Sequence, residues 1–110
     1  MIPHFYGMDI HQKFVVIAAT GQDQEVLLEP TRIEMNQLGA WAESHLTSED
    51  AVVLEAGTNA WHVVDQVTRY AGKVLVANPY KTKLIAEARI KNDKVDALAL
   101  AQLLAAHFIC

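Results

Sequence analysis

The chain has 110 residues, and its nine lysines and arginines against thirteen aspartates and glutamates give a formal net charge of −4. Hydrophobic residues make up 52% of the sequence and charged residues 20%, which excludes a disordered chain and predicts one compact domain over residues 1–110. The only cysteine is Cys110, so a disulfide scaffold is excluded. With no secretory signal at the start and no apolar run near the ~20 residues of a membrane-spanning helix, we expect a cytoplasmic protein without membrane contact.

The first part of the sequence is rich in aromatic and β-branched residues. Three strands are predicted there, over residues 5–9, 13–20 and 25–28, and the short polar stretches between them predict an antiparallel meander. Thr31 is followed three residues later by Glu34, which has the form of a capping box and follows Pro30. A first helix is therefore predicted over residues 32–45.

The second half of the sequence alternates between strand and helix patterns. Residues 51–54 and 73–77 are predicted strands, and the segment between them predicts a helix over residues 59–71 that Gly72 ends. Two further helices are predicted over residues 80–90 and 93–108. Alternation predicts parallel strands, so we expect an α/β fold in which a meander and parallel strands share one mixed sheet with helices on both faces.

Four acidic residues stand apart from the others by their positions. Asp9 and Glu55 each end an apolar strand, which places them at the sheet edge where open α/β sheets bind ligands. Asp93 and Asp96 are three residues apart and so share one face of a helix. If these elements meet, their carboxylates repel one another unless a cation lies among them, and oxygen ligands favour Mg²⁺ or Mn²⁺. Two such ions are a common arrangement for phosphoryl transfer.

The same motifs also have structural interpretations. Asp93 and Asp96 fit the first turn of a helix, where carboxylates cap the chain and interact with the helix dipole. Residues 55–59 fit a strand-to-helix turn in which Gly57 supplies a positive φ and Asn59 a cap. Asp9 has no such local role.

Basic residues are concentrated in one segment of this acidic chain. Five of the nine lie between residues 81 and 94. Such a strip is typical either of a solvated helix face or of contact with nucleic-acid phosphates. Its members, the candidate nucleic-acid-binding residues, are Lys81, Lys83, Arg89, Lys91 and Lys94.

A family resemblance covers nearly the whole chain. The segments 7–16, 53–61, 78–81 and 90–99 resemble, in this order, the DEDD transposases of bacterial insertion sequences, of the insertion-sequence 110 type. The resemblance implies a ribonuclease H-like fold similar to that of the RuvC Holliday-junction resolvase. It implies two Mg²⁺ (or Mn²⁺) ions and, as catalytic and metal-binding residues, Asp9, Glu55, Asp93 and Asp96.

The resemblance also implies partners and a missing part. Family members act on DNA during transposition and use a guide RNA encoded by the element. For this chain we also expect a homo-oligomer. They carry a second domain with a nucleophilic serine, whereas Ser44 and Ser48 of this chain do not match that serine motif. We therefore expect the chain to be the metal-dependent, amino-terminal catalytic domain of a transposase.

Two alternative functions belong to other classes. A nucleotide-binding domain of the actin and sugar-kinase type shares the topology and the early aspartate, but Ile10, His11 and Gln12 stand where that family has small residues and glycine. A non-catalytic interaction domain that pairs through its apolar carboxyl-terminal helix is the second alternative. Zinc chemistry is not expected, because the histidines lack paired ligand spacing; among them, His11 is of interest because it follows Asp9 closely.

Overall fold

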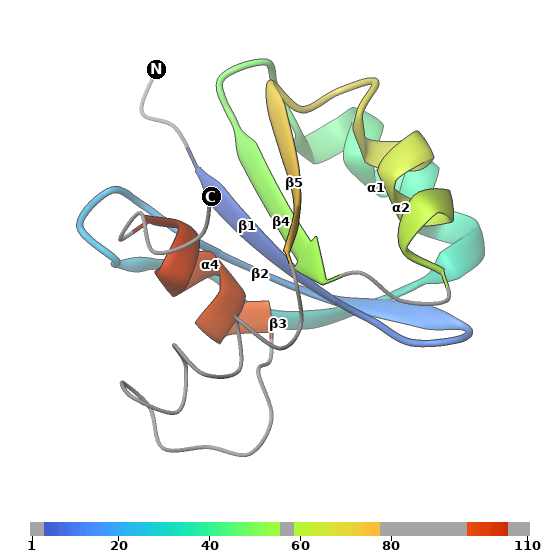
Figure 1. Cartoon of the computed structure of the whole chain (residues 1–110), viewed down its shortest axis with the longest axis horizontal. Helices are drawn as coiled ribbons and strands as arrows, with labels where there is room; N and C mark the ends of the chain where they lie inside the picture. The colour runs from blue at the N-terminus through green and yellow to red at the C-terminus, as the bar shows by residue number, and fades with distance from the viewer. Residues whose placement is uncertain (1–3, 56–58, 78–96, 106–110) are drawn as a thin grey trace.

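The computed structural model describes residues 4–55, 59–77 and 97–105, which form one sheet flanked by helices (Figure 1). The predicted helix over residues 80–90 and both ends of the predicted helix over 93–108 lie outside this part of the chain. No helix within it is long and apolar enough to span a membrane. The elements are β1 (Phe5–Ile10), β2 (Phe14–Thr20), β3 (Val26–Glu34), the 3₁₀ turn η1 (Met35–Gln37), α1 (Leu38–His45), β4 (Ala51–Glu55), α2 (Ala60–Val67), β5 (Lys73–Ala77) and α4 (Ala97–Ala105).

The five strands form a single mixed sheet in the order β3-β2-β1-β4-β5. β1 pairs antiparallel with β2 and parallel with β4, so it is the central strand where the two kinds of pairing meet. β2 also pairs antiparallel with β3, and β4 pairs parallel with β5. The predicted meander followed by parallel strands is confirmed.

Helices cover both faces of this sheet, as predicted (Figure 1). Alternate residues of the strands, such as Met8, Ile17 and Leu54, point to α1 and α2 and form the larger core with residues of those helices. The intervening residues, such as Val53 and Ala77, form a smaller core with α4 on the other face. Because side chains alternate between faces along a strand, every strand residue can be assigned to one of these two layers.

The predicted start of the first helix is wrong. Residues 32–34 belong to β3, where Ile33 pairs with Val15 and Arg32 with Val16, and the α-helix begins only at Leu38, after η1. Thr31 does not act as a cap, because its hydroxyl donates to the carbonyl of Glu29 at 2.7 Å. The apolar strand β2 needs a backbone partner along its whole length, and this pairing overrides the local capping pattern.

Pro30 lies inside β3 and does not mark the start of a helix. The pairing of β2 with β3 is irregular there: Ile17 is paired with Thr31, but Ala19 is paired with Leu28. Proline lacks an N–H and is tolerated at irregularities of edge strands, and β3 is an edge of the sheet. The residue that suggested a boundary therefore marks a bulge.

The second helix is also shorter than predicted. α2 ends at Val67, and residues 68–70 form turns before β5. Gly72 does not end the helix; its N–H donates to the carbonyl of Asp50 at 2.9 Å. Gly72 has no positive φ, and a Cβ there would overlap the Ser48 carbonyl, so close packing explains the glycine.

α4 lies directly on β1, with backbone against backbone. Gly7 is buried, and a Cβ at this position would overlap the carbonyl oxygen of Ala97 and lie 2.6 Å from the nitrogen of Ala101. The Thr20 hydroxyl, buried in β2, donates to the Ala101 carbonyl at 3.5 Å. The absence of a side chain at Gly7 thus sets how closely the helix approaches the sheet.

Gly7→Ala should therefore destabilise the domain by about 1–3 kcal/mol, because the added methyl group meets backbone atoms that cannot move independently. Gly39→Ala is the matched control, since a Cβ there meets only the mobile end of the Gln66 side chain, at 2.7 Å. It should be neutral or stabilising by up to about 1 kcal/mol. Urea unfolding followed by circular dichroism measures both; equal stability of the two variants would contradict the prediction.

Candidate active site

Asp9 and Glu55 lie side by side on the central strands. Met8 is paired with Leu54 in the parallel register, and the two carboxylates are the next residues on β1 and β4. Both belong to the face covered by α4, since they continue the alternation from Gly7 and Val53. Neighbouring strands are about 4.8 Å apart, so the predicted meeting of these two residues at one end of the sheet is confirmed.

The negative charge at this position is electrostatically unfavourable. Glu55 is half-buried, and its pKa is raised first by burial and second by the nearby charge of Asp9. Both causes act against the ionised carboxylate. A cation between the two side chains would relieve this unfavourable interaction.

The beginning of α4 lies beside these carboxylates. Ala97 is fully buried, and its carbonyl faces Gly7, two residues before Asp9 on the same face of β1. Asp9 is therefore about 7 Å farther along β1 than Gly7, and it lies past the described amino-terminal end of α4. The residue before Ala97 in the sequence is Asp96, which lies outside the described residues.

Several predicted site residues lie outside the described residues. These are Asp93, Asp96 and the whole basic strip, Lys81, Lys83, Arg89, Lys91 and Lys94. Within residues 4–55, 59–77 and 97–105, no three His, Cys, Asp or Glu side chains form a group that could hold a metal ion. The structure thus brings together two of the four predicted carboxylates.

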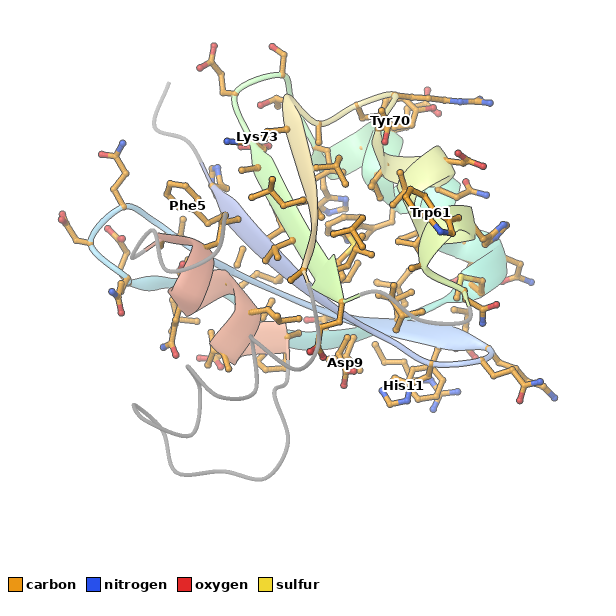
Figure 2. All side chains as sticks on the ribbon, in the orientation of Figure 1. Phe5, Asp9, His11, Trp61, Tyr70 and Lys73 are labelled. Atoms are coloured by element: carbon orange, nitrogen blue, oxygen red, sulfur yellow. The ribbon has the colours of Figure 1, made fainter. Side chains whose placement is uncertain are left out.

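His11 is a direct partner of Asp9. Its Nε2 lies 3.1 Å from Oδ2 of Asp9, and the two side chains are 32% and 17% exposed. The imidazole also stacks on the ring of Phe14, with centroids 4.4 Å apart and an interplanar angle of 15°. Figure 2 shows Asp9 and His11 together at one end of the sheet, far from Phe5 and Lys73. The ring is held in place by the carboxylate and the aromatic side chain.

Arg32 contacts Phe14, the ring on which His11 stacks, and is a residue that sequence reasoning missed. Its Cζ lies 3.8 Å from the centroid of the Phe14 ring. Its Nε and Nη2 donate to the Glu34 carboxylate at 3.1 and 3.4 Å. A helix over residues 32–45 would have turned Arg32 away from the sheet, whereas its place in β3 sets it on the same face as Phe14. The signal in the sequence was the two-residue alternation from Thr31 to Glu34.

Asn59 connects the start of α2 to the turn that carries His11. It stands at the N-cap position of α2 without a side-chain capping bond, so the alternative interpretation of its side chain as a cap is wrong. Gly57, the other residue of that interpretation, lies outside the described residues. The Nδ2 of Asn59 instead donates to the carbonyls of His11 and Gln12 at 3.4 and 3.3 Å. The start of α2 is thereby hydrogen-bonded to the turn from β1 to β2.

The raised pKa of Glu55 makes stability depend on pH. The neutral form is favoured in the fold, so the contribution of this group is most favourable below its ordinary pKa of 4.5 and is lost as pH rises through the raised value. In EDTA, Glu55→Gln should be more stable than the wild type at pH 7.5, and the difference should shrink as pH falls towards 4.5. Thermal melting across this range measures it, with Glu43→Gln at an exposed position of α1 as control. A difference that is constant with pH would contradict the electrostatic explanation.

Comparison with known proteins agrees with this geometry. The family model of the DEDD transposases of the insertion-sequence 110 type, described as "Transposase", matches residues 6–109, and no curated protein matches the chain. The match includes the strands that carry Asp9 and Glu55 and the segment that carries Asp93 and Asp96. The mixed sheet with helices on both faces agrees with the ribonuclease H-like, RuvC-like domain of this family. The chain therefore belongs to the DEDD transposases of the insertion-sequence 110 type.

Proposed function

We propose that this chain is the metal-dependent catalytic domain of a DNA transposase and acts on DNA phosphodiester bonds during transposition of an insertion sequence. The observation that supports this most directly is that Asp9 and Glu55, the residues after the paired Met8 and Leu54, lie side by side on the central strands β1 and β4, near the described start of α4. The family membership favours this function over nucleotide binding and over a purely structural role. Strand exchange would also need a serine nucleophile, in addition to the four carboxylates.

Asp9, Glu55, Asp93 and Asp96 would hold two Mg²⁺ or Mn²⁺ ions. The donor set consists of carboxylate oxygens, which suit these hard cations. The unfavourable charge at Glu55 is also of the kind that a cation relieves. When bound, such ions neutralise the phosphodiester and stabilise the attacking and leaving oxygens. The protein's own contribution is to hold Asp9 and Glu55 rigidly on neighbouring strands and to fix the Asp9 carboxylate through His11.

The proposed partners follow from the same function. DNA phosphates would contact the basic strip, Lys81, Lys83, Arg89, Lys91 and Lys94. A guide RNA encoded by the element would direct the choice of DNA, and a second copy of the chain would join the assembly, in the cytoplasm.

Metal binding can be tested by thermal melting of the wild type, Asp9→Asn and Asp93→Asn in EDTA and in millimolar Mn²⁺. Without metal, both substitutions should raise the melting temperature, because they remove repulsion. Both should abolish the rise caused by Mn²⁺, which at 100 times the dissociation constant corresponds to about 2.7 kcal/mol. Asp65→Asn, at an exposed position of α2, should retain the full rise. A wild type that does not respond to Mn²⁺, or aspartate variants that respond normally, would contradict the metal site.

The basic strip makes a separate prediction about DNA binding. Replacing Lys81, Lys83 and Lys91 together by Gln should weaken binding to a DNA duplex. It should also reduce the slope of log affinity against log salt by about 0.9 for each lost phosphate contact. Fluorescence anisotropy at several salt concentrations measures this slope. An unchanged slope would contradict a contact between these lysines and DNA phosphates.

A further inference from the structure

Three side chains on the side of Asp9 away from Glu55 form a stack of aromatic and guanidinium groups. Phe14 contacts both His11, at 4.4 Å between ring centroids, and the Arg32 guanidinium, whose Cζ lies 3.8 Å from the Phe14 centroid. We refer to these residues as the His11–Phe14–Arg32 stack. One end of the stack contacts Asp9, and the other contacts Glu34.

Arg32 is held in place while its side chain stays accessible. The side chain is 58% exposed, and Glu34 accepts hydrogen bonds from its Nε and Nη2. A guanidinium has five N–H donors in a rigid plane, so the Nη1 edge remains available to another planar or tetrahedral anion. No other acceptor for Arg32 occurs among the described residues. A preorganised guanidinium with one edge available is suited to a phosphate group.

The position of Arg32 relative to Asp9 fits a nucleic-acid strand. Asp9 is paired with Val16, and Val16 is paired with Arg32, so the three residues form one row across the sheet. Two strand spacings separate the Cα atoms of Asp9 and Arg32 by about 10 Å. The rise along the axis of B-form DNA is about 3.4 Å per nucleotide, and the backbone also winds around that axis, so this distance spans at most about three nucleotides.

The distribution of positive charge supports the same surface. Of the lysines and arginines in the described residues, Lys13 and Arg32 lie at the end of the sheet that holds Asp9. Arg69 and Lys73 lie by the start of β5, at the opposite end, where Figure 2 shows Lys73 far from Asp9 and His11. Cations beside the carboxylates would contact the DNA that approaches them.

We propose that the His11–Phe14–Arg32 stack is a DNA-binding subsite, in which Arg32 binds a backbone phosphate within about three nucleotides of the phosphodiester held at Asp9 and Glu55. The subsite rests on the proposed function, since its ligand is the DNA on which the carboxylates act. Phe14 supports the guanidinium plane, and Glu34 sets its orientation. This contact lies on the β2–β3 side of the carboxylates and belongs to a different segment from the basic strip.

The test measures binding of a DNA duplex to the 110-residue chain by fluorescence anisotropy, in EDTA, between 50 and 200 mM salt. Arg32→Gln should weaken binding about 5- to 10-fold and reduce the salt slope by about 0.9, the value for one phosphate contact. Arg69→Gln removes the same charge at the opposite end and should leave both quantities unchanged. Arg32→Lys, which keeps the charge without the planar group, should retain the salt slope and still bind less tightly than the wild type.

Phe14→Leu provides a second test of the stack, because it keeps an apolar side chain but removes the aromatic face. It should weaken DNA binding about 2- to 5-fold without changing the salt slope. If this half-buried position does not tolerate leucine, the Arg32 variants alone decide, since their side chain is exposed. Melting temperatures of all variants are compared first.

The outcomes separate the subsite from the metal site. If Arg32→Gln binds DNA as tightly as Arg69→Gln, or if the wild type does not bind DNA at 50 mM salt, the subsite is overturned. If Arg32→Gln weakens binding to an RNA duplex but not to a DNA duplex, the subsite is also overturned. If Arg32→Gln binds DNA as the wild type does while Asp9→Asn loses the Mn²⁺ response, the subsite is overturned and the proposed function stays intact. Weak binding by Arg32→Gln with no Mn²⁺ response in the wild type would overturn the metal-dependent function instead.

Discussion

The direct contact of the α4 backbone with Gly7 is the constraint on which the rest of the structure depends. It sets the distance between the helix and the central strand. It also places Ala97 against Gly7, which is two residues before Asp9 on the same face of β1. A side chain at Gly7 would push the helix away from the sheet. A packing requirement thus sets the position of α4 relative to the strand that carries Asp9.

The end of the sheet that holds the carboxylates combines opposing electrostatic requirements. Asp9 and Glu55 are brought together although burial and mutual repulsion disfavour the ionised form of Glu55. Around them, His11 and Arg32 supply nitrogen donors, and Phe14 holds both without adding charge. The negative charge of Asp9 and Glu55 suits a phosphodiester that is bound through a cation. The positive charge of Arg32 beside them suits the neighbouring phosphates of the same strand. At the opposite end of the sheet, buried Asp50 accepts hydrogen bonds from the backbone of His4 and Thr47 and has a structural role.

Local patterns predicted most of the elements but failed where neighbouring strands decided the outcome. The strands that carry Asp9 and Glu55 were predictable because their apolar residues end at a carboxylate. The interval from Thr31 to Glu34 satisfied both a capping box and a two-residue alternation, and pairing with β2 decided between them. The same error concealed Arg32, because a residue assigned to a helix cannot be placed opposite Phe14. Asn59 likewise fits a cap by its position, but its amide binds the neighbouring turn.

The sequence by itself determined the α/β class, the mixed sheet and the identity of the two carboxylates on the central strands, because these follow from periodicity and from the residues that end each strand. Only the tertiary structure decided the register that sets Asp9 beside Glu55, the approach of α4 at Gly7 and the stack of His11, Phe14 and Arg32. These features depend on pairing and packing between segments that are far apart in the chain. Such contacts leave no periodic signal in any one segment, so they emerge only when the strands and helices are assembled.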